Sequence, residues 1–261
     1  MKSFPFPPLE DTLAVVRLFV PLPEPAPTEV TLSGERRHYL LHVLRLAEDS
    51  VLEVFDGAGR AFEARVASLD AEEVRLVLGE ARHTPPSRPL HILQGLPKGD
   101  KLEWVLQKGT ELGAAGFYPV ATRRSLVKLE RLEDGRAQSK TARWQKIAEE
   151  AARQCGRSDV PQVHPPQPLL EAARALPAGT QLLVLDEEER ALTLGEAFRQ
   201  LPREAPVALV VGPEGGLARE EVQALNALGA RSVTLGRSVL RTESAALAAL
   251  AVMAYLDGEL G

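Results

Sequence analysis

Cysteine is almost absent from this sequence, and long apolar runs are absent too. The single thiol, Cys155, has no second cysteine with which to form a disulfide or a zinc-binding pair. The most apolar stretch, 244–256, is shorter than the ~20 residues of a membrane-spanning helix. Glu10 and Asp11 interrupt the region where a secretion signal would be apolar. These absences predict a cytoplasmic protein in a reducing compartment.

Asparagine and lysine are also scarce. The 261 residues include one asparagine, Asn226, and seven lysines against 24 arginines, together with 20 prolines. This bias occurs in heat-adapted proteins, and a GC-rich genome produces the same bias. Both explanations stay open.

The charge is unevenly distributed along the chain. The formal net charge is −5, yet the segment from Arg123 to Arg157 carries ten basic and five acidic residues. A basic stretch in an acidic protein is typical of a surface that binds a polyanion such as RNA. On charge alone, the more ordinary explanation is a solvated helix with internal ion pairs.

The sequence divides at 81-ARHTPPSRP-89, where adjacent prolines interrupt the periodic patterns on both sides. Before it, short strand-like runs cover 51–55, 61–66 and 73–78, and 56-DGAG-59 predicts a hairpin turn. A helix is expected over 34–45, with Ser33 as its N-cap. Seven prolines in residues 1–27 predict an extended lead-in. This half therefore predicts a small β-barrel or sheet.

After the break, strand-like and helix-like segments alternate. Strands are expected at 90–96, 116–121, 181–186, 206–212 and 231–236, and helices at 100–112, 138–155, 193–201, 218–228 and 242–257. Such alternation predicts a parallel sheet covered by helices on both faces, with ligands bound beyond the carboxyl ends of the strands. Three of these strand ends are rich in polar or glycine residues: 186–189, 212-GPEGG-216 and 236-GRSVLRTES-244.

The stretch 210-VVGPEGGL-217 raises the question of what needs so much bare backbone. Its spacing is neither the dinucleotide fingerprint GxGxxG nor the phosphate loop GxxxxGK[ST], and Pro213 lacks the N–H that a phosphate cradle would use. Two explanations have equal weight on the residues alone. The glycines allow a ligand to approach the backbone closely, or they form a tight turn in which Glu214 caps the next helix. In 54-VFDGAGRAF-62, strand-like residues follow the glycines, which indicates a hairpin.

Other groups of residues have ordinary explanations. His38 and His42 have the i, i+4 spacing of zinc ligands, but no third ligand is evident, so no metal site is predicted. With Arg45 they are equally an RNA contact or a polar helix face. Trp104 and Trp144 fall in helical patterns and are expected in the core. The acidic run 187-EEER-190 is expected to stay in solvent.

The last helix is almost entirely apolar. Its six alanines at 245, 246, 248, 249, 251 and 254 allow close packing onto the sheet or onto a second subunit. Core packing is the more ordinary of the two.

Taken together, "VGPEGGL" and "LGRSVLRTESA" resemble the SPOUT class of S-adenosylmethionine-dependent RNA methyltransferases, in particular the ribosomal RNA small subunit methyltransferase E family. The blocks 17-RLFV-20, 38-HYLLHVLRL-46, 98-KGDKLEWVLQKGTELGAAGFYPV-120 and 140-KTARWQKIAEEAARQCGRSDVPQV-163 are similar to that family as well. The resemblance spans about residues 17–257. The proline-rich lead-in and Ser244, where a threonine is expected, depart from it.

The resemblance implies an α/β fold: a C-terminal knotted parallel-sheet (SPOUT trefoil-knot) domain with a small N-terminal PUA-like β-barrel domain. The implied bounds are a lead-in at 1–16, the PUA-like RNA-docking domain at 17–80 and the methyltransferase domain at 88–261. It also implies a homodimer and an S-adenosyl-L-methionine site. The residues expected in that site are Val211, Gly212, Gly216, Leu235, Gly236, Val239, Leu240 and Arg241.

The implied reaction is methylation of uridine N3 in 16S ribosomal RNA, within the small ribosomal subunit. Because N3 carries a proton and the sulfonium methyl is already activated, catalysis must act mainly on the base. Arg241 is the candidate cation for the uracil oxygens, and Glu214 and Glu243 are candidate proton acceptors or helix caps. RNA contacts are expected at Arg17, His38, Arg45, Lys98, Lys108, Arg153 and Arg157.

Three alternatives remain: a non-catalytic RNA-binding protein, a dehydrogenase-like nucleotide enzyme, and a SPOUT enzyme that acts on another RNA. The first leaves the glycine loop unexplained, and the second lacks the GxGxxG fingerprint.

Overall fold

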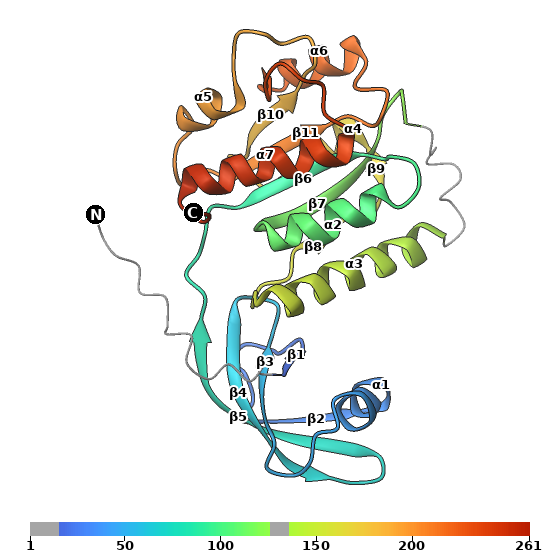
Figure 1. Cartoon of the computed structure of the whole chain (residues 1–261), viewed down its shortest axis with the longest axis vertical. Coiled ribbons are helices and arrows are strands. Elements are labelled where there is room, and N and C mark those ends of the chain that lie inside the picture. The colour runs from blue at the N-terminus through green and yellow to red at the C-terminus, as the bar shows by residue number, and fades with distance from the viewer. Residues whose placement is uncertain (1–15, 126–135) are drawn as a thin grey trace. The chain divides into compact units, whose positions relative to one another are not determined.

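The computed structural model describes residues 16–125 and 136–261. Two compact units make up the chain, Met1–Thr84 and Pro85–Gly261, and the division between them falls inside the proline-rich stretch 81–89. Figure 1 shows both units, each with its own sheet. The lead-in expected at 1–16 lies, apart from Val16, outside the described residues.

The first unit is built on a five-stranded sheet. Its strands are β1 (Arg17–Phe19), β2 (Glu29–Ser33), β3 (Val51–Phe55), β4 (Arg60–Leu69) and β5 (Glu73–His83), in the order β1-β3-β4-β5-β2. β1 pairs with β3 in parallel, whereas the other pairs are antiparallel. The three predicted strands are confirmed. β1 and β2 were not predicted, because both are short and lie within or beside the proline-rich lead-in, which obscures any strand pattern there.

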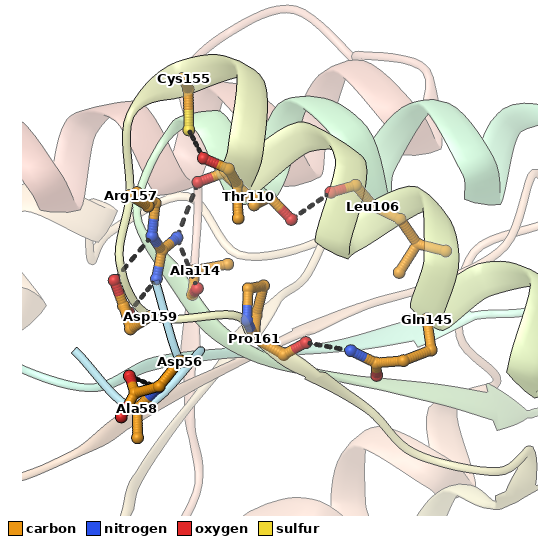
Figure 2. Close-up of polar contacts among 11 residues, drawn as sticks. Asp56, Ala58, Leu106, Thr110, Ala114, Gln145, Cys155, Arg157, Asp159 and Pro161 are labelled. Atoms are coloured by element: carbon orange, nitrogen blue, oxygen red, sulfur yellow. Dashed lines mark hydrogen bonds and ion pairs between the residues drawn. The ribbon is translucent and has the colours of Figure 1, made fainter. Parts of the chain in front are cut away.

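The turn between β3 and β4 is the predicted hairpin. Asp56 Oδ1 accepts hydrogen bonds from the backbone N–H groups of Ala58 at 2.8 Å and Arg60 at 3.0 Å, and Figure 2 draws the first of these. The helix predicted over 34–45 begins as α1 (Gly34–His38) and continues as a π-helical turn, η1 (Tyr39–Val43). Ser33 is the N-cap residue, as predicted, but its side chain makes no capping hydrogen bond.

The second unit is built on a parallel sheet, as predicted. Its strands are β6 (Leu90–Gly95), β7 (Ala114–Ala121), β8 (Gln162–Val163), β9 (Gln167–Pro168), β10 (Gln181–Leu185), β11 (Val207–Val211) and β12 (Arg231–Val233). The order is β12-β10-β11-β6-β7-β8, β9 also pairs with β7, and every pair is parallel. From β6 the chain first builds one side of the sheet and later the other, so the direction of winding changes between β6 and β11.

Helices cover both faces of this sheet (Figure 1). α2 (Lys101–Glu111), α3 (Arg136–Cys155), α5 (Leu194–Arg199) and α7 (Thr242–Asp257) lie on one face, and α4 (Leu169–Arg174) and α6 (Arg219–Ala227) lie on the other. Side chains of β11 alternate between the two cores: Val207, Leu209 and Val211 face the first, and Ala208 and Val210 face the second. This double burial explains why the strand is apolar at every position.

Arg157 braces the segment that follows α3 (Figure 2). Its guanidinium donates to the carbonyl oxygens of Thr110 at 2.7 Å and Ala114 at 2.9 Å, and it pairs with Asp159. Gln145 on α3 holds the same segment further on, donating to the carbonyl of Pro161 at 3.3 Å. These contacts fix the path of the chain from α3 into β8.

No helix in the described ranges 16–125 and 136–261 is long and apolar enough to cross a membrane.

Candidate functional site

The three strand ends singled out in the sequence meet at one cavity. β10, β11 and β12 are neighbours in the sheet, and the loops after their carboxyl ends line a cavity of about 420 Å³. A volume of this size falls within the usual range of small-molecule sites, and its position at the strand ends is the one expected for ligands of parallel sheets.

Gly212 and Gly216 allow the loop after β11 to fold back on itself. A Cβ atom on Gly212 would lie only 2.8 Å from the carbonyl carbon of Gly216. Gly216 has φ +70°, and its N–H donates to the carbonyl of Pro213 at 2.9 Å. A Cβ there would lie 3.2 Å from the carboxylate oxygens of Glu187. The bare backbone is thus required by the turn itself, and it leaves the cavity wall without side chains at these points.

Thr242 ties the loop before α7 to two central strands. Its hydroxyl donates to the carbonyl of Gly212 at 2.5 Å and accepts from Nε2 of Gln94 at 2.8 Å. Both Gln94 and Thr242 are buried. The ends of β6 and β11 and the start of α7 are therefore held together by two buried hydrogen bonds beneath the cavity.

Glu214 joins the glycine loop to the start of α2. Its carboxylate accepts from Nζ of Lys101 at 2.7 Å and from the backbone N–H of Lys98 at 3.0 Å. Partial burial acts to raise the pKa of Glu214, but the hydrogen bond from Lys101 and the backbone N–H groups outweigh it and hold that pKa below its ordinary value. The expectation that Glu214 caps the following helix is wrong, because Glu221 accepts from the N–H of Ala218 there.

Lys101 also faces a second carboxylate, that of Glu243 in the first turn of α7. Nζ of Lys101 lies 3.9 Å from Oε2 of Glu243. That oxygen is buried and has no hydrogen-bond partner among the described residues. Sequence reasoning missed Lys101, although it lies in the block 98-KGDKLEW-104 on which the resemblance partly rests.

Charged side chains surround the rest of the cavity. Arg241 lines it and is exposed, and its guanidinium has no hydrogen bond or ion pair within the part of the chain that the structure describes. Arg219 pairs with Asp186 at 2.9 Å and with Glu188 at 3.0 Å. Glu187, Glu188 and Arg190 are exposed to solvent, as predicted, and they also line the cavity wall.

All eight residues expected to bind the cofactor line this one cavity. They are Val211, Gly212, Gly216, Leu235, Gly236, Val239, Leu240 and Arg241. Of the catalytic candidates, Arg241 and Glu214 line the cavity, whereas Glu243 lines a neighbouring groove that shares Lys101 with it. Val239 and Leu240 are exposed apolar side chains on the rim, so a ligand there would cover them.

The residues expected to contact RNA are divided between the two units. In the first unit, Arg17 pairs with Glu53 at 2.5 Å and lies over the ring of Phe55, while His38 and Arg45 are exposed. Arg45 has φ +55° just after η1.

In the second unit, Lys98 is exposed in the loop before α2. Lys108 and Arg153 each pair with a glutamate three residues away on the same helix. Arg157 uses its donors in the brace described above, and its RNA contact stays a prediction. The net-positive segment 123–157 includes residues 126–135, which lie outside the described residues.

The two tryptophans differ. Trp144 is 8% exposed and belongs to the core, as predicted. Trp104 is 52% exposed, so its expected place in the core is wrong. Its position on α2 has the right spacing for an apolar face, but the helix turns that side chain outward.

The rings of His38 and His42 pack 4.6 Å apart, and no group of three or more His, Cys, Asp or Glu in residues 16–125 and 136–261 is placed to hold a metal ion.

Comparison with known proteins gives a consistent result. A family model described as an RNA methyltransferase domain matches residues 84–254, and one described as an RNA methyltransferase PUA domain matches residues 32–79. Ribosomal RNA small subunit methyltransferase E of Bacillus subtilis is 36% identical over 238 residues, which cover 89% of this chain and 91% of that protein. This chain belongs to that family of RNA methyltransferases.

Two solved structures are similar to this methyltransferase. Ribosomal RNA small subunit methyltransferase E from Neisseria gonorrhoeae, bound to S-adenosyl methionine, has a TM-score of 0.80 at 32% identity, over 93% of this chain and 98% of its own. A Legionella pneumophila protein in complex with the same cofactor has a TM-score of 0.76 at 28% identity over the same shares. The predicted fold class, an α/β SPOUT methyltransferase domain with a small PUA-like domain, is confirmed.

Proposed function

We propose that this enzyme transfers the methyl group of S-adenosyl-L-methionine to N3 of a uridine in 16S ribosomal RNA of the small ribosomal subunit. The observation that supports this most strongly is the glycine-walled cavity, in which all eight expected residues meet. It lies in a chain that matches a cofactor-bound small subunit methyltransferase E over nearly its full length. Action on ribosomal RNA also implies a cytoplasmic enzyme.

The residues present fit such a cofactor. The loop at Gly212 and Gly216 offers backbone without side chains, and the segment 235–241 adds backbone groups and the apolar rim of Val239 and Leu240. A flat adenine ring suits these apolar and backbone surfaces, and Asp186, Glu187 and Glu188 suit the positive charges of the donor. The cofactor supplies a methyl group on a positively charged sulfur.

The chain must then act on the base. Uridine N3 becomes nucleophilic when its proton leaves, and the negative charge spreads to the two uracil oxygens. Arg241 is an exposed cation on the cavity wall that can stabilise this charge. Of the two carboxylates, Glu243 is the better proton acceptor, because its Oε2 accepts no hydrogen bond from the described residues, while Glu214 accepts one from Lys101 and has a lowered pKa.

RNA docking is proposed for the PUA-like domain at 17–80, through Arg17, His38 and Arg45. In the methyltransferase domain at 88–261 it is proposed for Lys98, Lys108, Arg153 and Arg157. Contacts between such cations and phosphates give binding that is independent of sequence and sensitive to salt. The single uridine must therefore be selected by the shape of the RNA and by contacts near the cavity.

A homodimer is proposed through the outer face of α7. Its inner residues Ala246, Leu250 and Met253 are buried in the core. Ser244, Ala248, Ala251 and Tyr255, at spacings of four, three and four, share the opposite face, and Tyr255 is 66% exposed. Small residues there allow another helix to approach closely. An Ala251→Arg variant should sediment as a monomer where the wild-type chain sediments as a dimer.

The reaction is tested by incubating the enzyme with labelled cofactor and small ribosomal subunits that lack the modification. Digestion of the RNA should release labelled 3-methyluridine. Arg241→Ala should slow single-turnover transfer by about 10²- to 10³-fold while RNA binding persists, and Arg123→Ala, an exposed arginine paired with Glu220, serves as the matched control. Label in another nucleoside or another RNA would point to a different SPOUT specificity, and binding without transfer would point to a non-catalytic RNA-binding protein.

A further inference from the structure

A second concave site adjoins the cofactor cavity. It is a groove of about 590 Å³ lined by Asp100 just before α2, by residues of α2 as far as Gln107, by Ile147 of α3 and by Glu243 of α7. Lys101 lines both this groove and the cofactor cavity. A molecule in the groove therefore lies next to the place where the methyl donor is expected.

Trp104 gives the groove an exposed aromatic wall. More than half of this side chain is open to solvent, although tryptophan is usually largely buried. Nζ of Lys108 lies 5.4 Å from the centre of its ring. Trp104 and Lys101 are three residues apart and so share a face of α2. An exposed indole offers a flat surface on which a nucleobase can stack.

The charges of the groove favour a base over a phosphate. Asp100, Glu103 and Glu243 supply three carboxylates against the single ammonium of Lys101, and Arg143 from α3 pairs with Glu103 at 2.8 Å. A phosphate would be repelled by this set. A neutral ring that carries N–H groups would be attracted, because carboxylates accept such hydrogen bonds.

Glu243 supplies a carboxylate oxygen that faces Lys101 but accepts no hydrogen bond from the described residues. Its Oε2 is buried, receives no hydrogen bond from the described residues and lies 3.9 Å from Nζ of Lys101. A buried acceptor of this kind is costly unless a donor fills it. The Glu243 side chain as a whole is 16% exposed and lines the groove, so it must turn for its carboxylate to accept from an N–H group of a base there.

We propose that the groove holds the base that accepts the methyl group, stacked on Trp104, with its N3–H directed at Glu243. This inference rests on the proposed function and adds the location of the acceptor. The Glu243 carboxylate takes the N3 proton, and the electron pair left on N3 forms the bond to the methyl carbon. The carbon–sulfur bond breaks with its electron pair going to sulfur. Lys101 stays paired with Glu214 and lies beside Glu243.

Tryptophan fluorescence tests the stacking without relying on activity. The chain has two tryptophans, and buried Trp144 serves as an internal reference. A short single-stranded oligouridine, added to the full-length enzyme, should quench Trp104. Trp104→Phe should lose the quenching and keep RNA affinity within a few-fold, because phenylalanine still stacks. Trp104→Ala should weaken binding by about 5- to 100-fold, the value of one base–aromatic stack.

Transfer tests the proton step. Glu243→Gln should retain the quenching by oligouridine and slow single-turnover methylation by about 10²- to 10⁴-fold, because the amide cannot take the proton. Glu243→Asp should recover part of the rate.

The location is overturned if Trp104→Ala and Glu243→Gln methylate small subunits as the wild type does. It is overturned too if acrylamide quenching shows Trp104 to be shielded at concentrations where a dimer forms, since a second copy would then cover the groove. Absence of methylation by the wild type would instead reject the proposed function.

Discussion

Gly216 is the residue whose replacement most directly tests the cofactor cavity. It has φ +70°, and a side chain there would press on Glu187. Gly216→Val should lower the affinity for S-adenosylmethionine by tenfold or more. The loop must shift to relieve the contact with Glu187, and valine in a left-handed backbone conformation adds a strain of about 1–2 kcal/mol. Isothermal titration calorimetry measures this affinity.

Gly258→Ala is the matched control for Gly216→Val. Gly258 has φ +83° at the C-terminal cap of α7, and a Cβ atom added there would meet no other atom within 4 Å. The variant should lower stability by a similar amount and leave cofactor affinity unchanged. Equal affinity in a folded Gly216→Val protein would reject the cavity as the cofactor site.

Arg157 separates a structural role from RNA docking. Its guanidinium satisfies the carbonyl oxygens of Thr110 and Ala114. Arg157→Ala should lower the free energy of unfolding by about 1–3 kcal/mol, because those acceptors lose their donor. Urea denaturation measures the free energy of unfolding. The control is Arg123→Ala, at an exposed arginine, which should lower that free energy by less than about 1 kcal/mol. Unchanged stability with a weaker, less salt-dependent RNA affinity would show instead that Arg157 serves docking.

At the scale of elements, the sequence was most informative where one pattern decided the structure. β6, β10 and β11 are apolar runs bounded by turn residues, and burial on both faces requires such runs. β8, β9 and α4 were missed, because two strands of two residues carry no period and Pro165, Pro166 and Pro168 stand beside the six-residue helix. Local pattern also placed Trp104 inside, since spacing along α2 does not show which side neighbouring helices cover.

The site was predictable in its backbone parts and less so in its side-chain contacts. Glycines and strand ends mark the cavity in one dimension, because parallel strands deliver their carboxyl ends to one edge. The partners of Glu214 and Glu243 could not be predicted, since Lys101 is more than 110 residues from both and only the fold brings them together.

The pairing of β6 with β7 creates a titratable stack within the second unit. His91 of β6 packs edge-on against Tyr118 of β7, and Tyr118 stacks on His164 at 4.0 Å. Nδ1 of His91 is buried without a hydrogen-bond partner among the described residues. Burial, and then the charge of His164, lowers the pKa of His91 below its ordinary value, and burial lowers the pKa of His164.

These shifts predict that stability falls on the acid side of neutrality. Above the ordinary histidine pKa both states are neutral; as the pH falls below about 6.5, the unfolded chain binds protons that the folded chain resists, so unfolding is favoured. Urea denaturation at pH 8 and pH 5.5 should show the loss. His91→Phe keeps a flat ring and should weaken the dependence of the unfolding free energy on pH. His83→Gln, at an exposed histidine, should leave that dependence unchanged. A slope unchanged in His91→Phe would assign the effect to other groups.

At the scale of the whole molecule, a knotted path and a pairing of subunits are two expectations that no local pattern can supply. A knot is defined by the order in which distant segments pass one another, and periodicity in sequence carries no information on that order. The resemblance implied both features. The apolar composition of α7 fits burial in the core and a subunit interface equally well, and the outward position of Tyr255 is the observation that favours the second.

The division into two units predicts that cofactor binding and RNA docking can be separated. The cavity is lined from Lys101 to Ala245, and the two cores that support it belong to the second unit, while a third core belongs to the first. A fragment of residues 85–261 should therefore bind S-adenosylmethionine within about threefold of the full chain, a difference of less than about 1 kcal/mol. Its affinity for 16S RNA should fall and depend less steeply on salt, because the phosphate contacts proposed for the PUA-like unit would be lost. Full-length Arg45→Gln should change the salt dependence in the same direction and leave cofactor affinity alone. Calorimetry measures the cofactor affinity, and filter binding across a salt series measures the RNA affinity.

Loss of cofactor binding by a folded fragment would mean that the first unit helps to build the cavity, and an unchanged RNA affinity would place docking in the second unit alone.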